Sequence, residues 1–311
     1  MKENKILVTG GSGMIGSALR EIIPNAQFVS SKEYDLRIED QCVQMFEEKN
    51  PEWVIHLAAR VGGVKANHSY LADFYSENIL INTHVLNCAA KRNVKKMLSM
   101  LSTCVYPAQT TYPLNEKNIH KGEPHWTNFA YAYAKRMLDA HSRACREQYG
   151  SNFITAIPNN MYGKNDNFHL DDSHVIPAMI RKMHEAKLRN KPVELWGDGK
   201  PIREFTYAKD VAKIILFLME EYNEPNPINI GNTDSLSIGD LAHSIKNIVG
   251  LKQPIEWNSN QLSGQYKKPS TNDRLVGIGF NKDEYTKIET GLLETYNWFC
   301  KNYPNIRGYK K

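Results

Sequence analysis

Two pairs of reactive side chains stand out in this sequence of 311 residues. Ser102 and Cys104 lie in the stretch "LSTCVYP", which ends an apolar run typical of a β-strand. Residues i and i+2 of a strand face the same side, so this pattern predicts that a hydroxyl and a thiol reach one place. In "FAYAYAKRM", Tyr131 and Lys135 are four residues apart and share a helix face, whereas Tyr133 points elsewhere.

A phenol beside an ammonium group can exchange a proton with a bound carbonyl compound. The charge of Lys135 is expected to lower the pKa of Tyr131 and to make it a usable acid or base nearer neutrality. Ser102, at the carboxyl end of the preceding strand, can hydrogen-bond the same carbonyl oxygen. Because the spacing Tyr-x-x-x-Lys is common by chance, its meaning depends on the elements around it.

The glycines of "ILVTGGSGMIG" lie between the first predicted strand and the first predicted helix. Gly10, Gly13 and Gly16 permit a tight turn, close approach of a pyrophosphate and close packing of helix on strand. The helix N-terminus adds amide donors and a partial positive charge. A plain tight turn is the alternative, but the position at the start of a βαβ unit favours a dinucleotide site.

The segment "FVSSKEYDL" after the second strand indicates which dinucleotide is bound. NAD sites place an acidic residue here against the ribose 2′-hydroxyl. Ser31 and Lys32 come first in this chain, and Glu33 only follows them, which favours the 2′-phosphate of NADP(H) over a solvated loop lysine. We expect the cofactor site to comprise Gly10, Gly13, Met14, Ile15, Gly16, Ser31, Lys32, Asp35, Leu36, Leu57, Ala58, Ala59, Tyr131 and Lys135.

Alternating short strands and amphipathic helices must position these groups. The pattern predicts strands at 5–8, 27–30, 53–57, 97–102 and 152–158, and helices at 14–23, 38–49, 70–93 and 130–149. This rhythm is typical of an α/β fold with a Rossmann-type, doubly wound parallel sheet. We interpret residues 1–163 as an NADP-binding domain of this kind.

Beyond residue 163 the rhythm loosens into glycine- and asparagine-bearing loops between helices. Helices are predicted at 175–188, 209–221, 237–249 and 287–303. We interpret residues 164–311 as a smaller C-terminal α/β substrate domain, partly interleaved with the first. It is expected to cover the carboxyl edge of the sheet, where ligands of such folds bind.

Composition narrows the classes of partner and compartment. A formal charge of +5 without a block of like charge gives a nucleic-acid partner little support. The apolar run at 214–219 is too short for a bilayer span, and "MKENKILVTGG" has no signal-peptide pattern, so no membrane partner is expected. The scattered cysteines lack metal-site spacing and fit a reducing compartment, the cytoplasm by default. They are Cys42, Cys88, Cys104, Cys145 and Cys300.

Together, the glycine loop and the Ser–Tyr–Lys set resemble the extended short-chain dehydrogenase/reductase superfamily. A narrower resemblance follows from "LVTGGSGMIGSAL", "HLAARVGGVKAN", "LSTCVYP", "NMYGKNDNFHLDDSHVIPAMIRKMHEAK", "VELWGDGKPIREF" and "SGQYKK". In this order, along nearly the whole chain, they are similar to the GDP-L-fucose synthase family. The resemblance implies an NADPH enzyme that epimerises C3 and C5 of GDP-4-keto-6-deoxy-D-mannose and then reduces C4. It also implies a homodimer in which helices 70–93 and 130–149 pair across a two-fold axis.

The resemblance assigns roles to individual residues. Ser102, Tyr131 and Lys135 match the reductase set, Cys104 matches the epimerisation base, and His174 in "DSHVIP" matches the acid opposite it. A thiolate base needs a lowered pKa, which we expect a protonated His174 to provide. The family's positions for the GDP-linked 4-keto sugar are occupied here by Asn160, Lys182, Trp196, Arg203 and Lys268.

Departures from the family pattern leave the exact sugar open. Lys164 and Asn165 replace a Pro-His pair in "GKND", "PNN" replaces Pro-Thr-Asn, and Lys182 stands where some members carry arginine. A C4-reductase of a related GDP-4-keto sugar, a 6-deoxy-heptose or a 3,6-dideoxy sugar, is the main alternative, with one epimerisation or none.

Two further classes are less favoured. A 4,6-dehydratase would carry an Asp-Glu pair where this chain has Thr103 and Cys104. A silent NADP-binding sensor would not need an intact Ser–Tyr–Lys set. Outside the site, His56 is interpreted as packing in the sheet, and Cys88 and Cys145 as structural residues.

Overall fold

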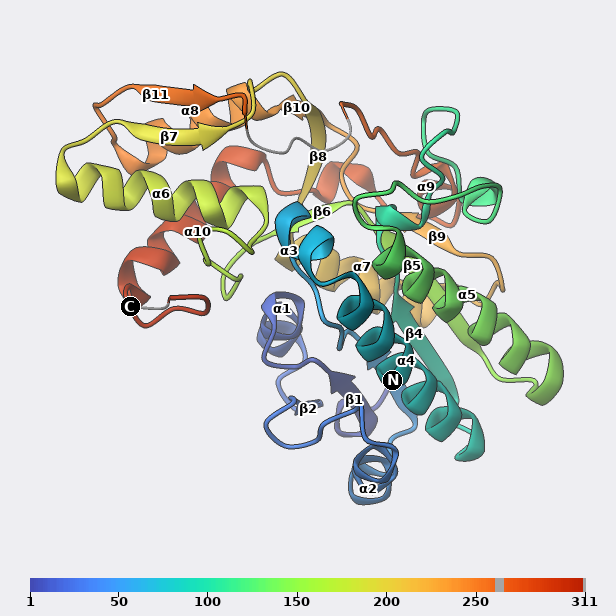
Figure 1. Cartoon of the computed structure of the whole chain (residues 1–311). Coiled ribbons are helices and arrows are strands. Elements are labelled where there is room, and N and C mark those ends of the chain that lie inside the picture. Colours follow the sequence, from blue (N-terminus) through green and yellow to red (C-terminus); the bar gives the residue numbers. More distant parts are fainter. Residues whose placement is uncertain (261–265, 310–311) are drawn as a thin grey trace.

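The computed structural model describes residues 1–260 and 266–309. Its central sheet consists of β1 (Ile6–Thr9), β2 (Gln27–Val29), β3 (Trp53–His56), β4 (Lys96–Met100), β5 (Phe153–Pro158) and β9 (Ile228–Ile230). These strands lie in the order β2-β1-β3-β4-β5-β9, and all neighbours are parallel (Figure 1). The predicted fold class, a Rossmann-type parallel sheet, is confirmed.

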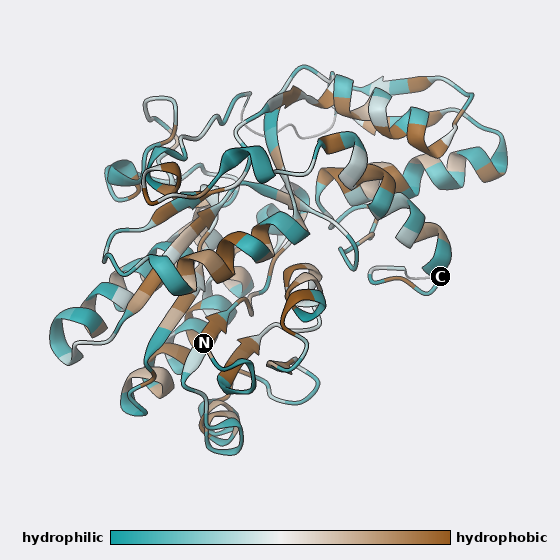
Figure 2. Cartoon of the chain, turned by 180° about the vertical axis from the view of Figure 1, so that it is seen from behind, coloured by the Kyte–Doolittle hydropathy of each residue, from teal (hydrophilic) through white to brown (hydrophobic). Residues whose placement is uncertain are grey.

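Helices cover both faces of this sheet. On one face lie α1 (Met14–Ile22) and α7 (Ala208–Glu221); on the other lie α2 (Glu39–Lys49), α4 (Leu71–Lys91) and α5 (Phe129–Tyr149). Successive residues of β1 serve opposite faces, since Val8 packs in the α1 and α7 core and Leu7 in the other. Strands buried on both faces are mostly apolar, as the brown central strands of Figure 2 show.

A second group of elements follows β5. It contains strands β6 (Asn160–Tyr162), β8 (Ile202–Tyr207) and β10 (Ser235–Ser237) in one sheet, β7 (Val193–Trp196) and β11 (Ile255–Asn258) in another, and helices α6 (Val175–Arg189), α8 (Ile238–Val249) and α10 (Ile288–Asn302). Phe168, Met183 and Phe299 are buried in its own core. The chain returns from this region to the central sheet at β9, so the two parts are not separated at one point of the sequence. The domain boundary at residue 163 therefore stays a prediction.

Short helices complete the described chain. These are α3 (Val64–Ser69), α9 (Asp273–Gly277) and the 3₁₀ turns η1 (Glu3–Lys5), η2 (Thr103–Val105), η3 (Glu116–Asn118) and η4 (Lys282–Glu284). None of the helices within residues 1–260 and 266–309 has the length and apolar character needed to cross a bilayer.

The predicted strand at 97–102 is confirmed as β4, but the strand alternation expected at Ser102 and Cys104 is wrong. β4 stops at Met100, and Ser102 keeps an extended backbone while its Oγ accepts a hydrogen bond from the Cys104 amide at 3.4 Å. This contact starts the η2 turn, so the two residues do not follow the alternation of a strand. The other predicted helices and strands are confirmed, with ends that differ by the one or two residues ordinary for such boundaries.

His56 is the last residue of β3 and is buried in the sheet, as expected. Its Nδ1 is 2.8 Å from the Thr9 hydroxyl and its Nε2 is 3.2 Å from Oδ1 of Asn82. Burial lowers the pKa of His56 to about 3, so the ring is neutral and serves packing. Cys88 and Cys145 are buried in α4 and α5, in agreement with a structural interpretation.

Candidate active site

One cleft of about 910 Å³ lies along the carboxyl ends of the central strands. Residues after β1, β2, β3, β4 and β5 line it, and loops of the second group of elements close it from the other side. This is where open α/β sheets bind their ligands. Every predicted cofactor residue except Lys135 lines this cleft.

The glycine loop packs closely against neighbouring backbone. Gly10 has φ +70°, and a Cβ added to it would lie 2.9 Å from the backbone nitrogen of Ala58. A Cβ on Gly16 would lie 2.7 Å from the carbonyl oxygen of Gly10. Gly13 precedes α1 and offers no capping side chain, which leaves the amides of the first helical turn facing the cleft for an anion. These residues fit a pyrophosphate.

At the far end of the cleft, the acidic residue Glu33 is turned away. Its Oε2 accepts hydrogen bonds from the Ser30 amide at 2.9 Å and from the Ser30 hydroxyl at 3.1 Å, and it is not among the lining residues. Ser31 and Lys32 line the cleft instead. The surroundings there suit a phosphate better than a bare ribose hydroxyl.

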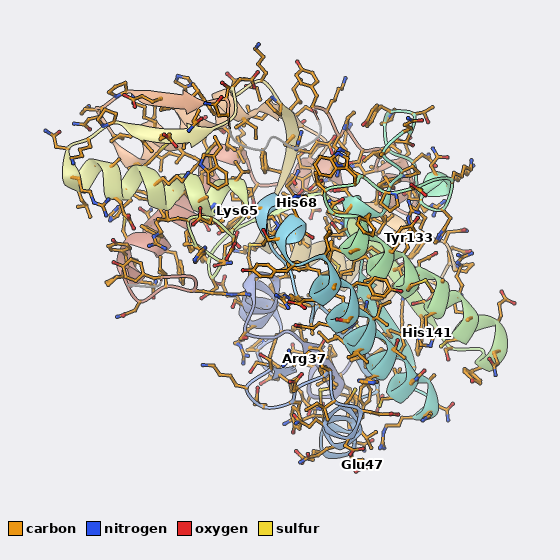
Figure 3. The ribbon with its side chains drawn as sticks, in the orientation of Figure 1. Arg37, Glu47, Lys65, His68, Tyr133 and His141 are labelled. Atoms are coloured by element: carbon orange, nitrogen blue, oxygen red, sulfur yellow. The ribbon has the colours of Figure 1, made fainter. Side chains whose placement is uncertain are left out.

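Sequence reasoning missed Arg37 in this region (Figure 3). Its guanidinium pairs with Asp35 at 2.6 Å and approaches Glu77 at 3.4 Å, and it lines the cleft. Its hydrogen bonds lower the pKa of Asp35, the carboxylate predicted as a cofactor residue. Since the charge of Asp35 is paired, it repels a phosphate less than a free carboxylate would.

Tyr131 and Lys135 share one face of α5. The ammonium Nζ of Lys135 lies 5.9 Å from the centre of the Tyr131 ring and donates a hydrogen bond to Met100 O at 2.8 Å. The ring packs edge-on against Phe74, and the phenol faces the cleft. Tyr133 is on another face of α5, where it is exposed (Figure 3). The guanidinium of Arg136 lies over its ring. The predicted division of the two tyrosines is confirmed.

The expected direction of the Tyr131 pKa is wrong. Burial and the neighbouring Cys104 charge raise it in this structure, whereas sequence analysis expected Lys135 to lower it. Burial in turn lowers the pKa of Lys135 to about 8. Desolvation outweighs a cation whose Nζ is held by Met100 rather than by the phenol. A raised pKa keeps Tyr131 protonated at neutral pH, which suits a proton donor.

Ser102 and Cys104 both line the cleft, but for another reason than predicted. The η2 turn carries Cys104 over the end of β4 to pack against Tyr131. Ser102 reaches the same space from the extended residue before the turn. Hydroxyl, thiol and phenol therefore meet in one cavity.

His174 also lines the cleft, as the residue that precedes α6. Desolvation by the surrounding protein lowers its pKa, and the positive charge of Arg307 lowers it further. The free protein thus favours a neutral imidazole, whereas sequence analysis expected a protonated one. Arg307 comes from the chain's far end, where its carbonyl accepts a hydrogen bond from Phe168 N at 2.9 Å.

The predicted sugar-nucleotide residues fall into two groups. Asn160, Arg203 and Lys268 line the cleft. Lys182 and Trp196 do not; they lie together outside it, with the Lys182 ammonium 4.6 Å from the centre of the indole.

Lys65 of α3 lies 5.7 Å from the indole of Trp196, at the same junction of α3 with α6 and β7 (Figure 3). Its ammonium also pairs with Asp171 at 3.2 Å. Of the "SGQYKK" segment, residues 263–265 lie outside the described residues.

Other lining residues were not predicted. Asp166 is buried, its Oδ2 has no hydrogen-bond partner, and desolvation raises its pKa to about 7. Asn128 donates its Nδ2–H to Cys104 Sγ at 3.0 Å. Burial lowers the pKa of His125, and the charge of Lys268 lowers it further. Only Asn128 had a local sequence signal, since asparagine just before a predicted helix is typical of a capping residue.

Comparison with known proteins places this chain among enzymes. Residues 6–231 match the model of the NAD dependent epimerase/dehydratase family. A curated GDP-L-fucose synthase from Dictyostelium discoideum is 40% identical over 97% of each chain. The crystal structure of a GDP-L-fucose synthetase from Naegleria fowleri bound to NADP is 36% identical, with a TM-score of 0.91 over 99% of this chain and 96% of that one. A GDP-6-OMe-4-keto-L-xylo-heptose reductase from C. jejuni is 27% identical, with a TM-score of 0.90 over 97% and 99%.

Proposed function

Because the chain belongs to the GDP-L-fucose synthase family, within the NAD dependent epimerase/dehydratase family, we propose that it converts GDP-4-keto-6-deoxy-D-mannose to GDP-L-fucose with NADPH. The observation that carries this proposal is the meeting of Ser102, Cys104, Tyr131 and His174 in the cleft that also holds the glycine loop. In such a cleft, a bound sugar can contact acid–base groups and, at the same time, lie next to a bound dinucleotide.

The epimerisation follows from the C4 carbonyl, which acidifies the hydrogens on C3 and C5. Cys104 removes a proton from one face of the sugar and His174 returns one to the other. Ser102 and Tyr131 hold the enolate oxygen by hydrogen bonds. This role needs the protonated form of His174, which burial and the charge of Arg307 disfavour in the free protein.

Reduction uses the same oxygen. When NADPH is bound, it supplies the hydride that C4 accepts. Tyr131 gives its proton to the C4 oxygen, and the Lys135 ammonium stabilises the phenolate that remains. We assign the pyrophosphate to the glycine loop and the 2′-phosphate to Ser31 and Lys32.

Deuterium distinguishes this function from the alternatives. Purified protein is incubated with GDP-4-keto-6-deoxy-D-mannose in D₂O, with and without NADPH. We expect deuterium at C3 and C5 in both cases and GDP-L-fucose only with NADPH. Reduction without deuterium would instead show a C4-reductase, the second candidate, which the likeness to the C. jejuni heptose reductase favours. NADPH binding without turnover of any GDP-4-keto sugar would indicate a sensor.

Lys32→Ala should weaken NADPH binding about 5- to 30-fold, because one exposed charge-assisted contact to the 2′-phosphate is lost. NADH, which has no 2′-phosphate, should bind as before. Fluorescence titration of both cofactors checks this. An equal loss for NADH and NADPH would show that Lys32 does not contact the 2′-phosphate.

We also propose that the protein is a homodimer in the cytoplasm. All five cysteines are free thiols, which suits a reducing compartment. Helices α4 and α5 pack together at one side of the molecule (Figure 1). Phe129, Tyr133 and Met137 form an exposed apolar stripe on α5 at four-residue spacing, which fits a two-fold helix contact.

Sedimentation at micromolar concentration should therefore give the mass of two chains. Met137→Glu should shift the protein to the mass of one chain, since two like charges would meet near the axis. Leu188→Glu, at an exposed position of α6, is the matched control and should leave the dimer intact. A single-chain mass for the unmodified protein would contradict the dimer.

A further inference from the structure

The sulfur of Cys104 has a specific hydrogen-bond donor. Nδ2 of Asn128 lies 3.0 Å from Sγ of Cys104, across 24 residues of sequence. Both side chains line the cleft. An amide nitrogen can only donate, so the sulfur is the acceptor in this contact, and a thiolate is a much stronger acceptor than a thiol.

Asn128 makes this contact instead of the one its position favours. It is the residue that precedes α5, where an asparagine side chain ordinarily accepts a hydrogen bond from the first helical turn. Here the side chain makes no capping bond. Its Oδ1 is buried without a partner. The side chain gives up about 1 kcal/mol of helix capping, which indicates a role other than helix stability.

A buried cationic side chain lies near Cys104. Burial lowers the pKa of Lys268, in the loop after β11, whereas its electrostatic interaction with Cys104 raises it and so favours the ammonium. His125 and Arg203 are the charged or titratable groups next to Lys268, and Tyr131 of α5 is the titratable group that faces Cys104 itself. His174 also lines the cleft, but burial and then the charge of Arg307 lower its pKa, so the free protein favours a neutral ring there.

We propose that Asn128 is a positioning residue that holds Cys104 as a thiolate directed at the sugar, with Lys268 as the balancing cation. The inference rests on the proposed function, in which Cys104 is the epimerisation base. It adds a residue, Asn128, whose side chain sets the orientation and protonation of that base without exchanging a proton itself.

Alkylation by iodoacetamide tests this in the free enzyme, because only the thiolate reacts. The exposed Cys300 is first replaced by serine, and the rate at Cys104 is followed by mass spectrometry from about pH 5 to about pH 10. Asn128→Asp keeps the shape but replaces the donor with a negative acceptor. It should lower the rate at pH 7 about 10- to 100-fold and move the profile up by about one to two pH units.

Two further variants make the test decisive. Asn128→Ser, a good capping residue too short to reach the sulfur, should shift the profile in the same direction by a smaller amount. Asn272→Asp is the matched control: Asn272 also precedes a helix and donates its amide, to Gly231 O at 3.3 Å, but lies outside the cleft. It should leave the profile unchanged.

Unchanged profiles in both Asn128 variants would overturn the proposal. No sugar takes part in alkylation, so a wrong substrate assignment would abolish deuterium exchange in the unmodified enzyme without affecting this comparison. With the correct sugar, Asn128→Asp should lower the maximal rate of exchange and leave KM close to normal, as expected for a group that acts through Cys104.

Discussion

Tyr131→Phe should reduce the rate of C4 reduction about 10²- to 10⁴-fold, the range expected when a general acid is lost. The ring itself is buried against Phe74, so phenylalanine fills the same space and the fold should be kept. NADPH should bind with nearly unchanged affinity, because only the proton donor is removed. Stopped-flow measurement of NADPH oxidation with the keto sugar checks the rate.

Tyr133→Phe provides the control for this prediction. Tyr133 is two residues away on the same helix but exposed, with Arg136 over its ring. Loss of its hydroxyl should leave reduction within about twofold of normal, because Tyr133 does not line the cleft and phenylalanine keeps the apolar ring of the α5 stripe. If Tyr133→Phe were the more damaging variant, the assignment of the reacting face of α5 would be wrong.

The fold could be predicted because its elements have strong local patterns. The central strands are apolar on both faces, the covering helices have one apolar face, and the glycine loop joins the first of each. The paired small sheets after β5 could not be predicted in the same way. Their strands are short, and β6, β8 and β10 pair across long separations in the sequence.

The site was predictable where spacing determines geometry. Gly10, Gly13 and Gly16, and the four-residue step from Tyr131 to Lys135, depend only on the loop and the helix that carry them. The strand alternation assumed for Ser102 and Cys104 failed, because a hydrogen bond within the segment turns the chain at Ser102.

Contacts between distant segments had no signal in the sequence. Arg307 approaches His174 from the other end of the second group of elements, and Lys268 approaches Cys104 from a loop after β11. The same limit applies to protonation. Spacing shows that Lys135 is next to Tyr131, but the direction of the phenol pKa depends on burial, which only the packed structure determines.

Cys104→Ser should separate the two reactions of the cleft. Serine is nearly isosteric with cysteine, and the half-buried thiol of Cys104 makes few polar contacts besides the one with Asn128. The fold and cofactor binding should therefore persist. A hydroxyl is a far weaker acid than a thiol, so almost none of it is in the deprotonated form that could act as a base at neutral pH. Deuterium incorporation from D₂O at C3 and C5 should fall about 10²- to 10⁴-fold. Cys300→Ser, at an exposed cysteine of α10, should exchange normally.

The product of the Cys104→Ser enzyme carries the stronger test. Ser102, Tyr131 and Lys135 remain in place, so hydride transfer can proceed on a sugar that has not been inverted. NMR of the product should then show a C4-reduced sugar with the original configuration at C3 and C5. His174→Asn should impair the same inversions, because it removes the group that returns the proton on the opposite face. Exchange at the unmodified rate in Cys104→Ser would mean that the thiol only packs against Tyr131 and that the cleft performs ketone reduction alone.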